Sequence, residues 1–135
     1  MTHPILALRS ALRARLAADA ALVSLLGGER IWDEPPRGSD PPYLTFGEAV
    51  ARDWSTGSSS GREHAFTLAA WSRQGGDAEL LAILARLEEL CADPALVLDG
   101  HRLVLLRVVG QETGRPDKTG LRRAVIRLAG LTEPL

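Results

Sequence analysis

The clearest hydrophobic pattern in the chain lies between His64 and Cys91. Residues 64–71 alternate with period two, which predicts a strand whose inward side chains are Phe66, Leu68 and Ala70. Residues 77–91 repeat every three to four positions, which predicts an amphipathic helix with an apolar stripe of Leu80, Ile83, Leu84, Leu87, Leu90 and Cys91. Such a helix must bury its stripe, and the sheet that contains the preceding strand is the nearest partner.

A second helical pattern covers residues 4–26, where Pro4 suits a first turn and Gly27 suits a helix end. Its apolar positions are Ile5, Leu8, Leu12, Leu16, Ala20 and Val23. Asp19 has the form of a new capped start, so the pattern leaves open whether the range holds one helix or a divided one.

Extended segments follow this helix. Residues 29–33 form a short extended piece, and four prolines make residues 34–42 a stiff loop. Residues 43–50 predict a strand in which Gly47 marks a bulge or a close backbone approach. The polar, Gly/Ser-rich residues 52–62 would then join this strand to residues 64–71 as an antiparallel hairpin with a flexible tip. Two interpretations of that segment remain open: a solvated loop that only connects the two strands, and a tip that has a function.

The C-terminal part predicts more strands. Asp99-Gly100 between apolar runs indicates a tight hairpin of residues 95–98 and 101–110, with Val104, Leu106 and Val108 on one face. A polar loop at residues 111–120 precedes a last strand at residues 121–129. This strand points Ala124, Ile126 and Leu128 inward, and Arg123, Val125 and Arg127 outward.

The order of helix, strands, helix and strands predicts an α+β fold, a mainly antiparallel sheet with two helices packed on one face. At 135 residues and 14.5 kDa, we expect one domain over residues 1–135. The net charge of −1 gives no general attraction to nucleic acid or anionic membranes. A single cysteine fits a reducing compartment, and no run approaches the roughly 20 apolar residues of a membrane helix. We expect a soluble protein that stays in its cell unless it leaves within a particle.

No group of residues in the sequence has the spacing of a catalytic site. We therefore expect that the protein is not an enzyme and has no catalytic residues, cofactor or metal. His3, His64 and His101 are isolated from one another and from other ligand types, so we expect solvated or hydrogen-bonded histidines. Cys91 falls on the apolar stripe and is expected in the core. The serines at 58–60 lack the flanking pattern of a strained nucleophile turn.

Residues near loops are the candidates for contacts with partners. Trp71 is expected largely in the core, whereas Trp32 and Trp54 begin loops and fit either interface anchors or edges of the core. The C-terminal strands are locally basic, which leaves a nucleic-acid or protein binding module as an alternative function. The interface candidates are Trp32, Asp33, Arg37, Arg52, Trp54, Arg62, Arg115 and Lys118.

Three short motifs carry a resemblance to a known family. They are Asp33 followed three residues later by Pro36, Pro42-Tyr43 followed by Gly47, and a strand that ends in Trp71-Ser72 before Gly75-Gly76 and a helix. In this order the chain resembles the tail-completion, or tail terminator, proteins of long-tailed phages. The resemblance extends to their equivalents in phage-like particles such as gene transfer agents, and it covers nearly the whole chain.

The resemblance implies a structural virion-assembly protein and not an enzyme. Its members form a homo-oligomeric ring, commonly a hexamer, at the head-proximal end of the tail tube. The ring ends tube polymerisation and joins the tail to the head connector or stopper protein. It implies assembly in the bacterial cytoplasm, no membrane partner, and DNA that passes the ring lumen without specific binding. The resemblance does not assign the contact residues; we infer from the loops themselves that residues 52–62 contact the tube or a neighbour and that residues 32–42 lie at the subunit interface.

Overall fold

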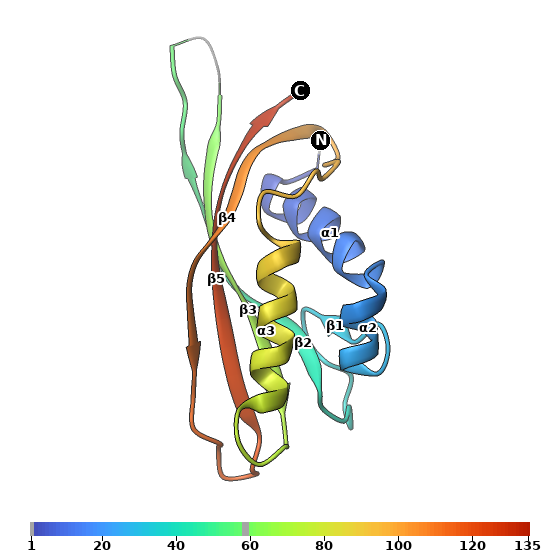
Figure 1. The fold of residues 1–135 in the computed structure, drawn as a ribbon. Coiled ribbons are helices and arrows are strands. Elements are labelled where there is room, and N and C mark those ends of the chain that lie inside the picture. Colours follow the sequence, from blue (N-terminus) through green and yellow to red (C-terminus); the bar gives the residue numbers. More distant parts are fainter. Residues whose placement is uncertain (1, 58–59) are drawn as a thin grey trace.

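The computed structural model describes residues 2–57 and 60–135, in which three helices cover one face of a five-stranded sheet (Figure 1). In chain order the elements are α1 (Pro4–Ala17), α2 (Ala20–Leu26), β1 (Ile31–Trp32), β2 (Tyr43–Asp53), β3 (Arg62–Ser72), α3 (Ala78–Leu90), β4 (His101–Thr113) and β5 (Arg122–Pro134).

The sheet has the strand order β1-β2-β3-β5-β4. β1 is parallel to β2, and every other pair is antiparallel. Two long hairpins, β2–β3 and β4–β5, are joined at the centre by the ladder between β3 and β5, which runs from Arg62 to Ser72. The predicted α+β class with a mainly antiparallel sheet is therefore confirmed.

The N-terminal helical region is divided, so three helices and not two pack on the sheet. Asp19 stands between α1 and α2, and its carboxylate accepts the backbone N–H of Leu22 at 2.9 Å. This bond satisfies a free N–H of a new first turn, which is why the chain begins a second helix there. Gly27 ends α2 in the left-handed region, with φ of 77°.

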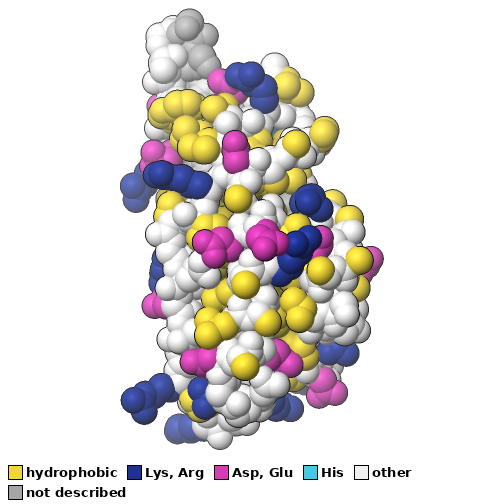
Figure 2. Space-filling view, in the orientation of Figure 1, with side chains coloured by type: hydrophobic (Ala, Val, Ile, Leu, Met, Phe, Trp, Pro, Cys, Tyr) yellow, Lys and Arg dark blue, Asp and Glu magenta, His cyan; other side chains and the backbone are white. Residues whose placement is uncertain are grey.

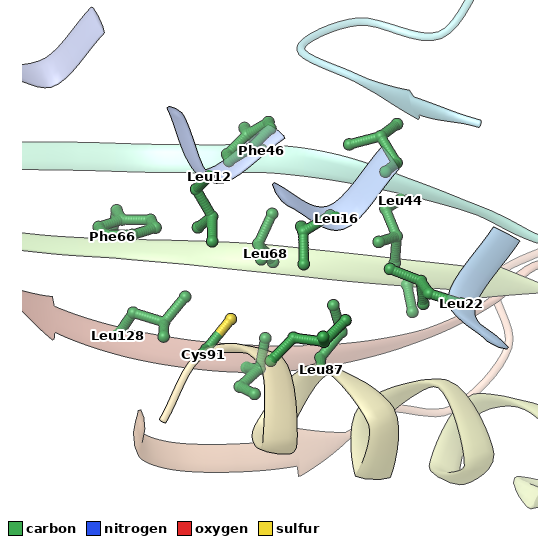
Figure 3. Close-up of a cluster of buried hydrophobic side chains, with 14 of the residues drawn as sticks. Leu12, Leu16, Leu22, Leu44, Phe46, Phe66, Leu68, Leu87, Cys91 and Leu128 are labelled. Carbon is green, nitrogen blue, oxygen red and sulfur yellow. The ribbon is translucent and has the colours of Figure 1, made fainter. Parts of the chain in front are cut away.

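The core lies between the helices and the inner sheet face (Figure 3). The predicted stripe of α3 is buried as a whole, and Cys91 follows it as the C-cap. The sheet contributes the predicted inward rows of β3 and β5, together with Leu44 and Phe46 of β2. From α1 and α2 come Ala7, Leu8, Leu12, Leu16, Leu22 and Leu26.

The prediction of a strand at residues 95–98 is wrong. Only a single bridge, Leu98 to His101, flanks the Asp99-Gly100 turn, and Val97 is 94% exposed. β4 instead finds its partner in β5, and both strands run further than predicted, to Thr113 and Pro134. The connection from α3 also contacts β4 further along the strand, where the Asp93 N–H donates to the Leu106 carbonyl at 2.9 Å.

Two side chains point differently from the prediction. The register of β4 shifts between Leu103 and Leu105, so the intervening Val104 is exposed while Leu106 and Val108 face the core. Trp71 is half-buried beside Thr45 and Arg123 and lies outside the core, because it follows the inward-facing Ala70 and must point the other way.

Gly47 lies in a β-bulge, as predicted. The register between β2 and β3 shifts between Phe46 and Ala49. A Cβ at position 47 would lie 2.1 Å from the Thr67 Oγ1, far below van der Waals contact. The bulge and the close approach predicted as alternatives therefore occur together.

Candidate assembly interface

The face of the sheet away from the helices carries mixed polar and apolar side chains. The indole Nε1 of Trp71 donates to Thr45 Oγ1 at 2.9 Å, and the Arg123 guanidinium lies 5.8 Å from the centre of the Trp71 ring. Arg127 is ion-paired with Glu112. These side chains line a shallow groove of about 320 Å³. It is a surface suited to contact with another macromolecule and has no enclosed volume for a small ligand.

The β2–β3 hairpin projects past the helices at one end of the molecule (Figure 1). Its strands are longer than predicted, so Arg52 belongs to β2, and Arg62 begins β3 with an ion pair to Asp53 at 3.6 Å. The Trp54 N–H donates to the Gly61 carbonyl at 2.8 Å, and the indole is 39% exposed. The base of the tip is thus held by a hydrogen bond and presents an aromatic side chain. Ser58 and Ser59, part of the predicted flexible segment and of the serine run, lie outside the described residues.

The β4–β5 turn, residues 114–121, lies at the other end of the molecule (Figure 1). Asp117 braces it by accepting hydrogen bonds from the Thr119 hydroxyl and from the backbone N–H groups of Thr119 and Leu121. These bonds lower the pKa of Asp117, with the Thr119 hydroxyl the largest cause. Arg115 and Lys118 are exposed there, and Figure 2 shows Lys and Arg side chains gathered around this lower end.

The remaining candidates lie near β1. The Trp32 ring packs on Tyr43, with centroids 5.7 Å apart, and so closes the edge of the sheet. Asp33 is ion-paired at 3.7 Å with Arg9, whose guanidinium also lies over Phe46. Trp32 and Asp33 therefore already have structural contacts within the chain, while Arg37 is exposed in the proline-rich loop.

The eight candidates thus form three groups and not one site. One group lies beside β1, one at the β2–β3 tip and one at the β4–β5 turn. The last two are separated by the β3 ladder of 11 residues, which at about 3.3 Å per residue is roughly 35 Å.

Three of the five arginines of β4 and β5 are ion-paired within the chain. Arg102 pairs with Glu133, Arg122 with Asp77 at 3.5 Å, and Arg127 with Glu112. These pairs disperse the positive charge that a phosphate-binding surface would need. The nucleic-acid alternative therefore gains no support from the arrangement of these strands.

The histidines are hydrogen-bonded, as expected. His64 Nε2 is 2.8 Å from the Thr132 hydroxyl, His101 Nε2 is 2.8 Å from the Thr2 carbonyl, and His3 Nδ1 accepts the Ile5 N–H. The pKa of His64 is lowered to about 4, chiefly by burial and in smaller part by the charges of His101 and His3. In residues 2–57 and 60–135, no three His, Cys, Asp or Glu side chains are grouped as metal ligands.

Two further properties of the described part bear on function. Burial raises the pKa of the Cys91 thiol to about 12, so it is not a reactive nucleophile. None of the helices there has the length and apolar character needed to cross a bilayer.

The sequence interpretation missed the outer groove, because it placed Trp71 largely in the core. The available signal was the alternation itself. If Phe66, Leu68 and Ala70 face inward, then Trp71 faces outward, on the side already assigned to Arg123 and Arg127.

Comparison with known proteins gives a family for this fold. The model of the family described as Tail completion protein gp17 matches residues 10–133. Among solved structures, a chain from the virion of a native gene transfer agent (GTA) particle is 27% identical, with a TM-score of 0.89 over 98% of this chain and 99% of that one. A search of curated proteins found no match. The family match covers most of the chain, which therefore belongs to the tail completion protein gp17 family, a family of structural proteins of phage-like particles.

Proposed function

We propose that this protein forms a homo-oligomeric ring, a hexamer, at the head-proximal end of a phage-like tail tube. There it ends tube polymerisation and joins the tail to the head connector or stopper protein. Membership of the tail completion family and the full-length similarity to a chain of a gene transfer agent virion support this role.

The observation that carries the proposal is the placement of two braced loops at opposite ends of one sheet. The β2–β3 tip, with Arg52, Trp54 and Arg62, projects beyond the helices at one end, and the turn with Arg115 and Lys118 lies at the other. A subunit between two different partners needs two separate surfaces, one toward each partner. In this proposal the tip contacts the tube or a neighbouring subunit, and residues 32–42 lie at the subunit interface.

The ring is assembled in the bacterial cytoplasm and becomes part of the particle. It needs no cofactor, and its contribution is the binding of protein partners and not catalysis. DNA passes through the lumen without specific binding. A salt titration of DNA binding by the purified chain separates this role from a nucleic-acid module, which requires measurable affinity that falls steeply with salt.

The test replaces residues 55–60 at the hairpin tip by Asn-Gly, a turn that suits two antiparallel strands. We expect an unchanged thermal midpoint, because residues 55–57 and 60 are exposed, but unjoined heads and tails in electron micrographs of a producing strain. The matched control is Leu81→Ser, an exposed position on α3. Normal yields of complete particles from the tip variant would remove the tip from the joining contact. A chain that stays monomeric at high concentration and in assembled tails would contradict the ring.

A further inference from the structure

The sheet ends in two strands with free edges. β1 pairs only with Leu44 and Thr45 of β2, so residues 46–53 of β2 have no neighbouring strand on that side within the described part of the chain. β4 forms the other edge. There the Asp93 N–H contacts the Leu106 carbonyl, and residues 107–113 beyond it lie alongside no other strand than β5 in the described residues. Unpaired backbone N–H and C=O groups of this kind are ready to pair with another strand.

The two free segments lie at the same level of the sheet. Val50 pairs with Ala65, Ala65 with Ala129, and Ala129 with Arg107, so Val50 and Arg107 are the two ends of one row. The next row on the same face of the sheet has Thr67 and Arg127 at its centre. The register shifts of both edge strands fall beside it, at 46–49 on β2 and at 108–110 on β4.

The side chains on these edges are complementary. Val50 on β2 and Val109 on β4 are 46% and 53% exposed, which is high for large apolar residues. Glu48 and Arg107 are also exposed, and neither takes part in an ion pair among the residues that the structure describes. One edge therefore offers a valine and an acid, and the other a valine and a base.

The strand directions allow the two edges to meet. Three successive antiparallel pairings make β2 and β4 antiparallel to each other. A second copy, rotated about an axis along the strands, therefore brings its β2 antiparallel to β4 of the first without being turned over. The two surfaces in such a contact differ, so it can repeat from copy to copy and close into a ring.

We propose that residues 107–111 of β4 pair with residues 46–50 of β2 in a second copy of this chain, so that the sheet continues antiparallel from subunit to subunit. This inference rests on the proposed ring and specifies its subunit contact. In the pairing, Val50 and Arg107 are cross-strand neighbours on the outer face. Glu48 then lies diagonal to Arg107, and Val50 diagonal to Val109, which are favourable cross-strand combinations.

Disulfide cross-linking tests the contact. Val50 and Arg107 of one chain are three strand spacings apart, roughly 14 Å, which is too far for a disulfide within the chain. A V50C/R107C double variant under mild oxidation should therefore give a ladder of covalent oligomers up to the ring, while each single variant gives none. Leu81→Cys combined with Arg107→Cys is the matched control and should not cross-link. Dimers from V50C alone would show a symmetric contact and overturn the proposal.

Native mass measurements on the cysteine variants distinguish a failure of the edge pairing from a failure of the proposed ring. Rings without a disulfide between position 50 and any of positions 105, 107 or 109, which cover a stagger of two residues either way, would overturn the edge pairing and leave the ring standing. Absence of rings, in solution and in assembled particles, would overturn both.

Charge reversal gives an independent readout. Glu48→Arg should weaken assembly at least several-fold, and Arg107→Glu in the same chain should restore it, because the two charges are exchanged. Failure of the double variant to recover assembly, with both variants folded, would count against the proposed pairing.

Discussion

The guanidinium of Arg86 on α3 donates two hydrogen bonds to the carboxylate of Asp19, at 2.8 Å from Nε and 2.6 Å from Nη2. The same carboxylate accepts the Leu22 N–H at the start of α2. One side chain thus begins a helix and ties it to another that is 67 residues away in sequence. The bond from Arg86 is the largest cause of a pKa of about 2 for Asp19.

The variant Asp19→Asn should lower the thermal midpoint, because it keeps an oxygen for the cap but loses the charged pair. The lowered pKa of Asp19 stabilises the fold above its ordinary value of 3.8, and this contribution is lost as pH falls toward about 2. Unfolding free energies of the wild type and the variant should therefore converge between these two pH values. Glu89→Gln, which removes the exposed second partner of Arg86, is the control and should have a smaller effect. Parallel pH profiles for wild type and D19N would exclude the charged pair as the cause.

The lowered pKa of His64 should cause a second loss of stability, at higher pH than the loss caused by Asp19. Its pKa is lowered from 6.5 to about 4, so the unfolded chain takes up a proton over this range and the folded chain does not. Stability should fall as pH drops from 6.5 and level off near 4, by up to about 3 kcal/mol. Denaturant titrations across this range measure the slope. His64→Gln should flatten it, and an unchanged slope in this variant would assign the dependence to another group.

A side chain at position 47 should lower the stability of the fold. Gly47→Ala places a Cβ 2.1 Å from Thr67 Oγ1, and we expect a loss of about 2 kcal/mol of unfolding free energy from the forced shift. Thr67→Ala removes the obstructing hydroxyl, so the double variant should recover most of the loss. The double-mutant cycle measures this coupling. Additive effects of the two substitutions would mean that the backbone at the bulge, and not the hydroxyl, sets the requirement for glycine.

Cys91 should be inert in the folded protein. Its thiol is fully buried, and burial raises its pKa to about 12, so almost no thiolate forms at neutral pH. A chromogenic disulfide reagent should react at the rate of unfolding in buffer and at once in denaturant. Rapid labelling of the native protein would contradict the core position. Cys91→Ala removes packing contacts, whereas Cys91→Ser places a hydroxyl in the core. The serine variant should be the less stable of the two.

Local patterns predicted the parts of the fold in which one periodicity and one buried face coincide. β3 and α3 are such elements, because each buries a continuous row on the same core. Residues 95–98 have the same apolar character, but they form one bridge to β4, at Leu98 and His101, while the long ladder of β4 is made with β5. The division at Asp19 was visible as a cap, while its partner Arg86 was not, since a contact over 67 residues leaves no local trace.

The candidate surfaces divide in the same way. Loop composition identified the tip with Trp54 and the turn with Arg115 and Lys118, and the structure places both at exposed ends. Whether they contact partners remains a prediction. The free edges at Val50 and Arg107 could not be found from the sequence, because an edge exists only once the strand order is known.

The paired register shifts beside Thr67 and Arg127 also bear on how unassembled subunits remain in solution. A regular strand of an unrelated protein would lose register where it met either bulge, and bulges are a common protection of sheet edges against aggregation. A second copy carries its own irregularity at the matching level and can accommodate the break. The interruption in each edge would therefore discourage indiscriminate strand addition and select for self-association.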